Sequence, residues 1–140
     1  MNVRFFLDTN IFVYSFDENA PKKSDRASEL IRQAVRSRNG IVSYQVVQEF
    51  LNVALRRFTH PMTAAEAQQY LATTLRPLMA VNSSAALYVE ALRLASSYSL
   101  SWYDSVVVAA AIEGGAHVLY TEDLQHGQEF GTLRIENPFL

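Results

Sequence analysis

The stretch Val3-Arg-Phe-Phe-Leu-Asp8 sets the fold of this protein. Its aromatic and aliphatic residues predict a short buried strand that stops at Asp8. Residues 9–16 carry apolar side chains at positions 11, 12, 14 and 16, which predicts a short helix. A buried strand that leads directly into a helix is typical of α/β proteins.

The rest of the chain repeats this alternation. Further strands are expected at residues 41–43, 78–81, 117–121 and 133–135, and helices at 25–38, 44–58, 63–75, 84–98 and from Ser101 onward. Residues 17–23, which include Pro21, are expected to form a polar loop. Residues 106–112 are all apolar, so that helix should be buried on most sides. The pattern predicts an α/β fold with a central, mostly parallel sheet of four to five short strands, flanked by helices on both faces.

Length and composition narrow the possibilities. A chain of 140 residues fits a single domain, residues 1–140. It has no cysteine, which excludes disulfides and thiolate metal sites and suits a reducing cytoplasm. Asp8 interrupts the first apolar run too early for a signal peptide, and no apolar stretch approaches the length of a membrane span, so no membrane association is expected.

Four acidic residues fall where a site of such a fold is expected, at the carboxyl ends of the strands. Asp8 and Asp123 follow strands, and Glu49 and Asp104 lie early in helices whose starts can face the same edge. Each also has an ordinary interpretation: Asp8 as an N-cap, Asp104 as the acid of a capping box begun by Ser101, Asp123 as a turn residue, and Glu49 as a solvated helix residue.

Together the four carboxylates favour a metal site. Carboxylate oxygens are natural ligands for Mg²⁺ or Mn²⁺, and clustered cations can hold a phosphodiester and activate water. The net charge is −2, which opposes nucleic-acid binding. Setting the four acids aside leaves ten acids against twelve basic residues, or +2, so charge does not decide the question.

Other chemistries fit less well. The sequence has no glycine-rich phosphate-binding loop and no recognisable serine or cysteine nucleophile motif. His60, His117 and His126 lack the spacing of metal ligands. A phosphotransfer domain using Asp8 as acceptor would need a lysine at another strand end, and the only lysines are in the 17–23 loop.

The four acidic segments resemble the motifs of the PIN domain, and specifically those of the VapC-type toxins of bacterial toxin–antitoxin pairs. The resemblance covers essentially the whole chain and extends to the ending Ile135-Glu-Asn-Pro-Phe139. The four segments, in order, are Phe6-Leu-Asp8-Thr-Asn10-Ile-Phe-Val-Tyr14, Val47-Gln-Glu49-Phe-Leu-Asn52, Leu100-Ser-Trp-Tyr-Asp104-Ser-Val-Val-Val-Ala-Ala-Ala111 and Leu119-Tyr-Thr-Glu-Asp123-Leu.

The resemblance implies a single PIN-like domain and a metal-dependent endoribonuclease. Its catalytic acids around Mg²⁺ or Mn²⁺ would be Asp8, Glu49, Asp104 and Asp123, with Asn10 and Thr121 as supporting polar residues. By the same resemblance Asp8 and Asp104 would be the firmest ligands, and Glu49 would orient or deprotonate the attacking water. The alternative is a non-catalytic PIN-like module that binds RNA or protein. A nuclease acting on DNA is a variant of the first reading.

The resemblance also implies partners: an RNA substrate, a VapB-type antitoxin and a second copy in a homodimer. The antitoxin tail would lie in a hydrophobic groove, with which Phe12, Tyr14, Phe16, Phe50 and Phe58 are compatible, although each is more readily a core residue. The candidate phosphate contacts are Arg56, Arg57, Lys22 and Lys23. Cations near a helix end and loop lysines also have ordinary structural explanations.

Overall fold

The computed structural model describes residues 3–140. Its strands are β1 (Phe5–Leu7), β2 (Gly40–Ser43), β3 (Met79–Val81), β4 (Val118–Tyr120), β5 (Glu129–Phe130) and β6 (Leu133–Glu136). Its helices are α1 (Thr9–Tyr14), α2 (Pro21–Ser37), α3 (Tyr44–Arg56), α4 (Ala64–Tyr70), the π-helical segment η1 (Leu71–Leu75), α5 (Arg76–Leu78), α6 (Ala85–Tyr98) and α7 (Trp102–Glu113).

The strands form one sheet in the order β3-β2-β1-β4-β6-β5. Every neighbouring pair is parallel except β5 and β6. The predicted α/β fold with a mostly parallel sheet is therefore confirmed, with six strands instead of four to five. The unexpected strand β5 has only two residues, too few to show a periodic pattern, and it pairs with β6 across a turn in which Gly131 has a φ of 62°.

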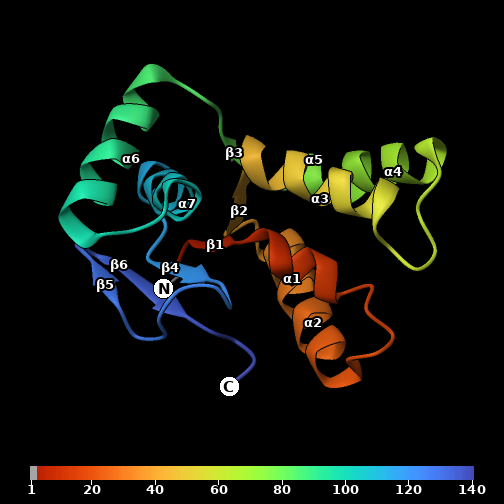
Figure 1. Ribbon diagram of the computed structural model, residues 1–140. Coiled ribbons are helices and arrows are strands. Elements are labelled where there is room, and N and C mark those ends of the chain that lie inside the picture. The colour runs from red at the N-terminus through yellow and green to blue at the C-terminus, as the bar shows by residue number, and fades with distance from the viewer. Residues whose placement is uncertain (1–2) are drawn as a thin grey trace.

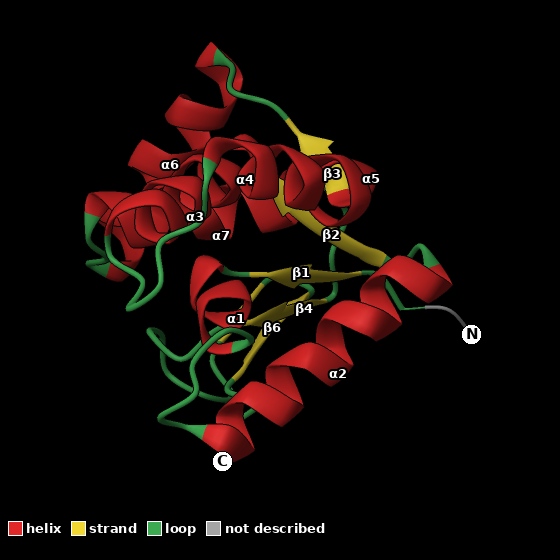
Figure 2. Ribbon diagram, turned by 90° about the vertical axis from the view of Figure 1, so that its right-hand side faces the viewer, coloured by secondary structure: helices red, strands yellow, loops and turns green. Residues whose placement is uncertain are grey.

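Helices cover the sheet on both sides. Helix α2 crosses one side, and α6 and α7 lie on the other (Figures 1 and 2). Residues 105–111 of α7 are all buried, as the apolar sequence predicts. One continuous cluster of buried residues joins the sheet to both helical layers.

Two boundaries differ from the sequence prediction by three residues or more, and several others by one or two. The segment predicted as a loop, residues 17–23, contributes its last three residues to α2, which begins at Pro21. Proline suits the first turn of a helix because its missing N–H group has no partner there. The helix predicted for 63–75 is continued by η1 and α5, so β3 begins at Met79. At its start the predicted capping box of Thr63 and Glu66 is present.

An aromatic cluster packs α1 against α3 and α4. The Phe50 ring centroid lies 6.2 Å from that of Phe12, 6.0 Å from that of Phe58 and 5.0 Å from that of Tyr70. Phe16 joins the cluster through Phe50, Phe58 and Tyr70 but remains 42% exposed, whereas Phe12 and Phe50 are fully buried. Phe12 and Phe50 are thus core residues, and the cluster members that reach the surface are Phe16 and the half-buried Phe58 and Tyr70.

No helix within residues 3–140 combines the length and the apolar character that a membrane crossing requires.

Candidate active site

The carboxyl ends of β1 and β4 place Asp8 beside Thr121. The two strands are parallel neighbours, and the Asp8 N–H donates to the Tyr120 carbonyl over 3.1 Å. Asp8 caps α1, because its Oδ1 accepts a hydrogen bond of 2.7 Å from the Thr9 N–H. Its Oδ2 accepts one of 2.8 Å from the Thr121 hydroxyl. Asp8 therefore does serve as an N-cap through Oδ1, but its other carboxylate oxygen, Oδ2, bonds to Thr121 at the carboxyl edge of the sheet.

Asp123 is held to the same edge by the two residues proposed as supporting. Its N–H donates to the Thr121 Oγ over 3.1 Å, and its Oδ2 accepts 3.1 Å from the Asn10 amide. The other amide atom of Asn10, Oδ1, is buried without a hydrogen-bond partner among residues 3–140. Asn10 and Thr121 therefore connect Asp8 and Asp123 through a short polar network.

Glu49 reaches this network from α3. Its Oε1 accepts a hydrogen bond of 2.7 Å from the Gln45 amide, and its Oε2 accepts one of 3.4 Å from the Thr9 hydroxyl. The sequence analysis missed both donors. Gln45 could have been found, since it precedes Glu49 by four residues and so shares its helix face. Thr9 directly follows Asp8, and nothing in the sequence pattern indicates that its hydroxyl would contact Glu49.

Burial and neighbouring charge perturb Asp8. Loss of hydration raises its pKa to about 6, hydrogen bonds from Thr9 and Thr121 oppose that rise, and the charges of Asp123 and Glu49 add to it. A buried carboxylate beside two others lacks a compensating positive charge. The charges of Asp123 and Glu49 therefore both act on the buried Asp8 carboxylate.

This perturbation predicts a pH-dependent stability in metal-free protein. The pKa of Asp8 is higher in the folded protein than in the unfolded chain, so the folded state binds the proton more tightly. The stabilisation from this group is therefore complete below about pH 4 and is lost as the pH rises through about 6. In EDTA we expect the free energy of unfolding to fall by roughly 3 kcal/mol from this group between pH 4 and pH 7. Urea unfolding across that range measures it.

The control for this titration is a carboxylate outside the cluster. Asp8→Asn should flatten the decline, whereas replacement of the exposed Asp25 on α2 with asparagine should leave it in place. Equal slopes for the two variants would show that Asp8 is not its source.

Asp104 stands apart from the other three acids. Ser101 caps α7 and accepts a hydrogen bond of 3.2 Å from the Asp104 N–H. The reciprocal bond of the predicted capping box, from the Asp104 carboxylate to the Ser101 N–H, is not formed. Among residues 3–140 the half-buried carboxylate has no hydrogen bond or ion pair, and the charges that act on Asp8 come from Asp123 and Glu49, not from Asp104.

The donor set suits a hard divalent cation, although its ligand geometry is not assembled. In the part of the chain that the structure describes, no three acidic or histidine side chains are close enough to hold a metal ion. The available donors are nevertheless all oxygen atoms, the ligands that Mg²⁺ and Mn²⁺ prefer. The buried Oδ1 of Asn10 has no hydrogen-bond partner among residues 3–140, and Asp123 and Glu49 add negative charge near the buried Asp8, so a cation would suit the chemistry of this edge.

The basic residues proposed for RNA contact have different surroundings. Lys23 forms a 3.0 Å ion pair with Glu122 and stands 4.7 Å from the centroid of the Tyr14 ring. The other three, Lys22, Arg56 and Arg57, are exposed. Arg57 lines a cavity of about 410 Å³ between the α1–α2 and α3–α4 connections, together with Phe16 and Phe58.

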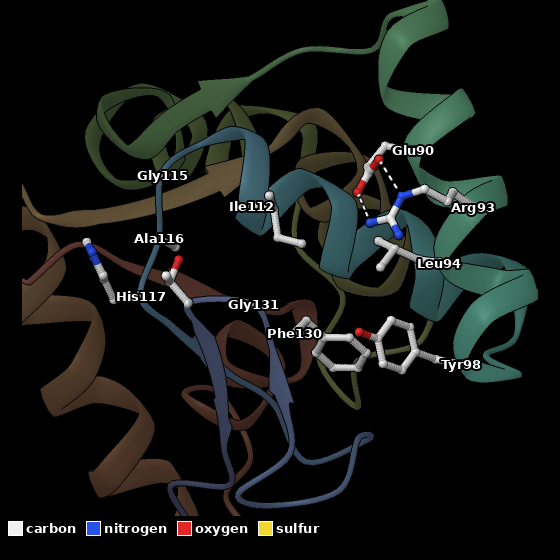
Figure 3. Close-up of a pocket in the computed structure, with 11 residues that line it drawn as sticks. Glu90, Arg93, Leu94, Tyr98, Ile112, Gly115, Ala116, His117, Phe130 and Gly131 are labelled. Atoms are coloured by element: carbon white, nitrogen blue, oxygen red, sulfur yellow. Dashed lines mark hydrogen bonds and ion pairs between the residues drawn. The ribbon is translucent and has the colours of Figure 1, made fainter.

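A second cavity, of about 420 Å³, lies at the opposite edge of the sheet. Figure 3 shows it between α6, the end of α7 and the β5–β6 turn. Its single carboxylate, Glu90, accepts hydrogen bonds from two nitrogens of the Arg93 guanidinium, Nη2 at 2.6 Å and Nε at 3.0 Å. Because this acid is already neutralised, the cavity does not compete with the Asp8 edge as a metal site.

The comparisons with known proteins agree with this fold. A family model described as the PIN domain matches residues 5–128. A search of curated proteins finds no match.

Solved structures with the same fold share little sequence with this chain. A toxin–antitoxin complex from Klebsiella pneumoniae matches with a TM-score of 0.66 and 18% identity, covering 95% of this chain and 96% of that one. VapBC2 from Rickettsia felis, bound to a promoter DNA fragment, matches with a TM-score of 0.67 and 17% identity, covering 96% of this chain and 98% of that one. VapC20 of Mycobacterium tuberculosis, described as a toxin that cleaves the sarcin–ricin loop, matches with a TM-score of 0.60 and 19% identity, covering 85% of this chain and 89% of that one.

Proposed function

The chain belongs to the PIN domain family, and from that premise we propose that it is a metal-dependent endoribonuclease, the toxin of a toxin–antitoxin pair. The observation that carries the proposal is the network of Asp8, Thr121, Asn10 and Asp123 at the sheet edge, with Glu49 facing it. The sarcin–ricin-loop cleaving toxin among the similar structures supports RNA as the substrate.

Asp8, Asp123, Asp104 and Glu49 would hold Mg²⁺ or Mn²⁺, which when bound would offset phosphate charge and lower the pKa of water. Thr121 and the Thr9 N–H fix the buried Asp8 carboxylate, so this ligand is preorganised. Asn10 orients Asp123. Glu49 and Asp123 are exposed, so solvent and substrate can reach both carboxylates.

Glu49 is the group proposed to orient the attacking water and accept its proton. Gln45 and Thr9 each donate to a different carboxylate oxygen, which limits the rotation of the side chain. A base held in this way needs only to remain ionised and within hydrogen-bond reach of the water. The reaction adds the water oxygen to phosphorus and breaks the bond to the leaving ribose oxygen.

An antitoxin partner and a second copy of the chain complete the proposal. The similar structures from Klebsiella pneumoniae and Rickettsia felis are described as toxin–antitoxin assemblies. The cavity lined by Phe16, Phe58 and Arg57 would receive the apolar side chains of an antitoxin tail. The exposed Arg56, Arg57 and Lys22 would contact RNA phosphates, and Lys23 would do so only by giving up its ion pair with Glu122.

The experiment that tests this proposal is RNA cleavage by purified protein with Mn²⁺ or Mg²⁺, compared with EDTA. Cleavage that requires the metal would support it, and the same products from matched DNA would redirect it to a DNA nuclease. Absence of both cleavage and metal binding, the latter measured by calorimetry, would favour a non-catalytic module that binds RNA or protein.

A further inference from the structure

A cavity of about 270 Å³ lies between α3, α6 and the start of α7. It is one hydrogen bond away from Glu49, since Gln45 lines it and donates to that carboxylate over 2.7 Å. On its other side, Tyr103 directly precedes Asp104. Four aromatic residues and two amides dominate its wall: Tyr44, Tyr88, Trp102, Tyr103, Gln45 and Gln48.

The aromatic side chains are fixed in part and exposed in part. The Tyr44 and Tyr88 hydroxyls are hydrogen-bonded at 2.6 Å, and the Trp102 ring centroid lies 6.1 Å from that of Tyr88. Trp102 is nonetheless 39% exposed and Tyr103 72% exposed. Flat apolar rings held at a cavity wall can stack against a planar ligand with little loss of conformational entropy.

The polar groups of the wall indicate a neutral ligand that forms hydrogen bonds. Gln45 is only 7% exposed, and its Oε1 has no hydrogen-bond partner among residues 3–140. Gln48 presents a second, exposed amide. The wall contains no charged residue, so it offers nothing to a phosphate, whereas amides match the donors and acceptors at the edges of a nucleobase.

We infer that this cavity holds one unpaired nucleobase of single-stranded RNA, next to the phosphodiester at the acidic edge. The inference rests on the proposed function for the identity of the nucleic acid. The cavity is slightly smaller than a typical site for a drug-sized ligand, which suits a single base. The buried Gln45 Oε1 favours a base over the apolar surface of a second copy of the chain, which would leave this acceptor without a donor.

Trp102 gives a direct test because it is the only tryptophan of the chain. In EDTA, which prevents metal-dependent cleavage, a short single-stranded RNA should quench its fluorescence. An oligonucleotide of the same length and charge, abasic throughout, should not. Tyr103→Ala should weaken RNA binding roughly ten- to hundredfold, the usual value of one stacked base, and Tyr103→Phe should restore it.

The matched control is Leu92→Ala, which alters an exposed apolar residue of α6 outside the cavity and should leave RNA affinity unchanged. Equal binding of the abasic chain, or an unchanged affinity of Tyr103→Ala, would overturn the inference. So would conversion of a dimer to a monomer by Tyr103→Ala, measured by light scattering, because the face would then be an interface between copies.

The two proposals can fail separately. Base-dependent quenching of Trp102 without metal-dependent cleavage would sustain the base site and remove the nuclease. Metal-dependent cleavage with no response of Trp102 to RNA would retain the nuclease and overturn the base site.

Discussion

Replacement of Asp104 with asparagine is expected to reduce metal-dependent RNA cleavage by roughly a thousandfold while the fold is preserved. Loss of one of the proposed carboxylate ligands would remove several kcal/mol of transition-state stabilisation, and about 1.4 kcal/mol corresponds to a factor of ten. The cost to stability should stay below about 1 kcal/mol, since the carboxylate forms no hydrogen bond among residues 3–140 and contributes only its charge near the start of α7.

Asp104 is the most informative of the four acids to replace. No hydrogen bond of the described residues joins its carboxylate to Asp8, Glu49 or Asp123, so the motif resemblance and the proposed chemistry alone assign it to the site. Glu113→Gln, at the other end of the same helix, is the matched control and should cleave at the wild-type rate. Initial cleavage rates in Mn²⁺, with circular dichroism to verify folding, provide the comparison. Wild-type cleavage by folded Asp104→Asn would remove this residue from the site.

Phe50→Ala is expected to destabilise the protein by roughly 3–5 kcal/mol, the largest stability effect that we predict. Phe50 is fully buried and packs against the rings of Phe12, Phe16, Phe58 and Tyr70, so its removal leaves a cavity that these four rigid neighbours cannot fill. Domains of this kind have a total stability of about 5–15 kcal/mol, so the midpoint of thermal unfolding should fall by roughly 10–20 °C.

Thermal and urea unfolding measure this effect, and Leu55→Ala provides the control on the same helix. Leu55 is exposed, so its truncation should cost less than about 1 kcal/mol. A loss at Phe50 no larger than that at Leu55 would mean that the aromatic cluster does not hold α3 in place. It would then not be what positions Glu49, the preceding residue.

The fold was predictable because its elements are long or strongly patterned. The buried β1 and the apolar α7 are evident from their side chains alone. The two-residue strand β5 is not, because it exists only through its pairing with β6. The start of α2 was wrong because Pro21 was interpreted as a loop residue, although proline is equally suited to a first helical turn.

The candidate site was predictable to the extent that backbone topology determines it. Asp8 and Thr121 meet because each follows or ends a strand of a parallel pair, and parallel strands end at one edge. The contacts of Gln45 and Thr9 with Glu49 depend on rotamers, which periodicity does not specify.

The central position of β1 has a consequence for the newly made chain on the ribosome. Asp8 receives its hydrogen bond from Thr121, 113 residues later, and Asn10 is equally distant from Asp123. At about 5–20 residues per second, translation needs roughly 6 to 23 seconds to pass from the first partner to the second. Throughout that interval the chain carries Asp8 without the residues that complete its surroundings, so a nascent or prematurely terminated product would be catalytically silent.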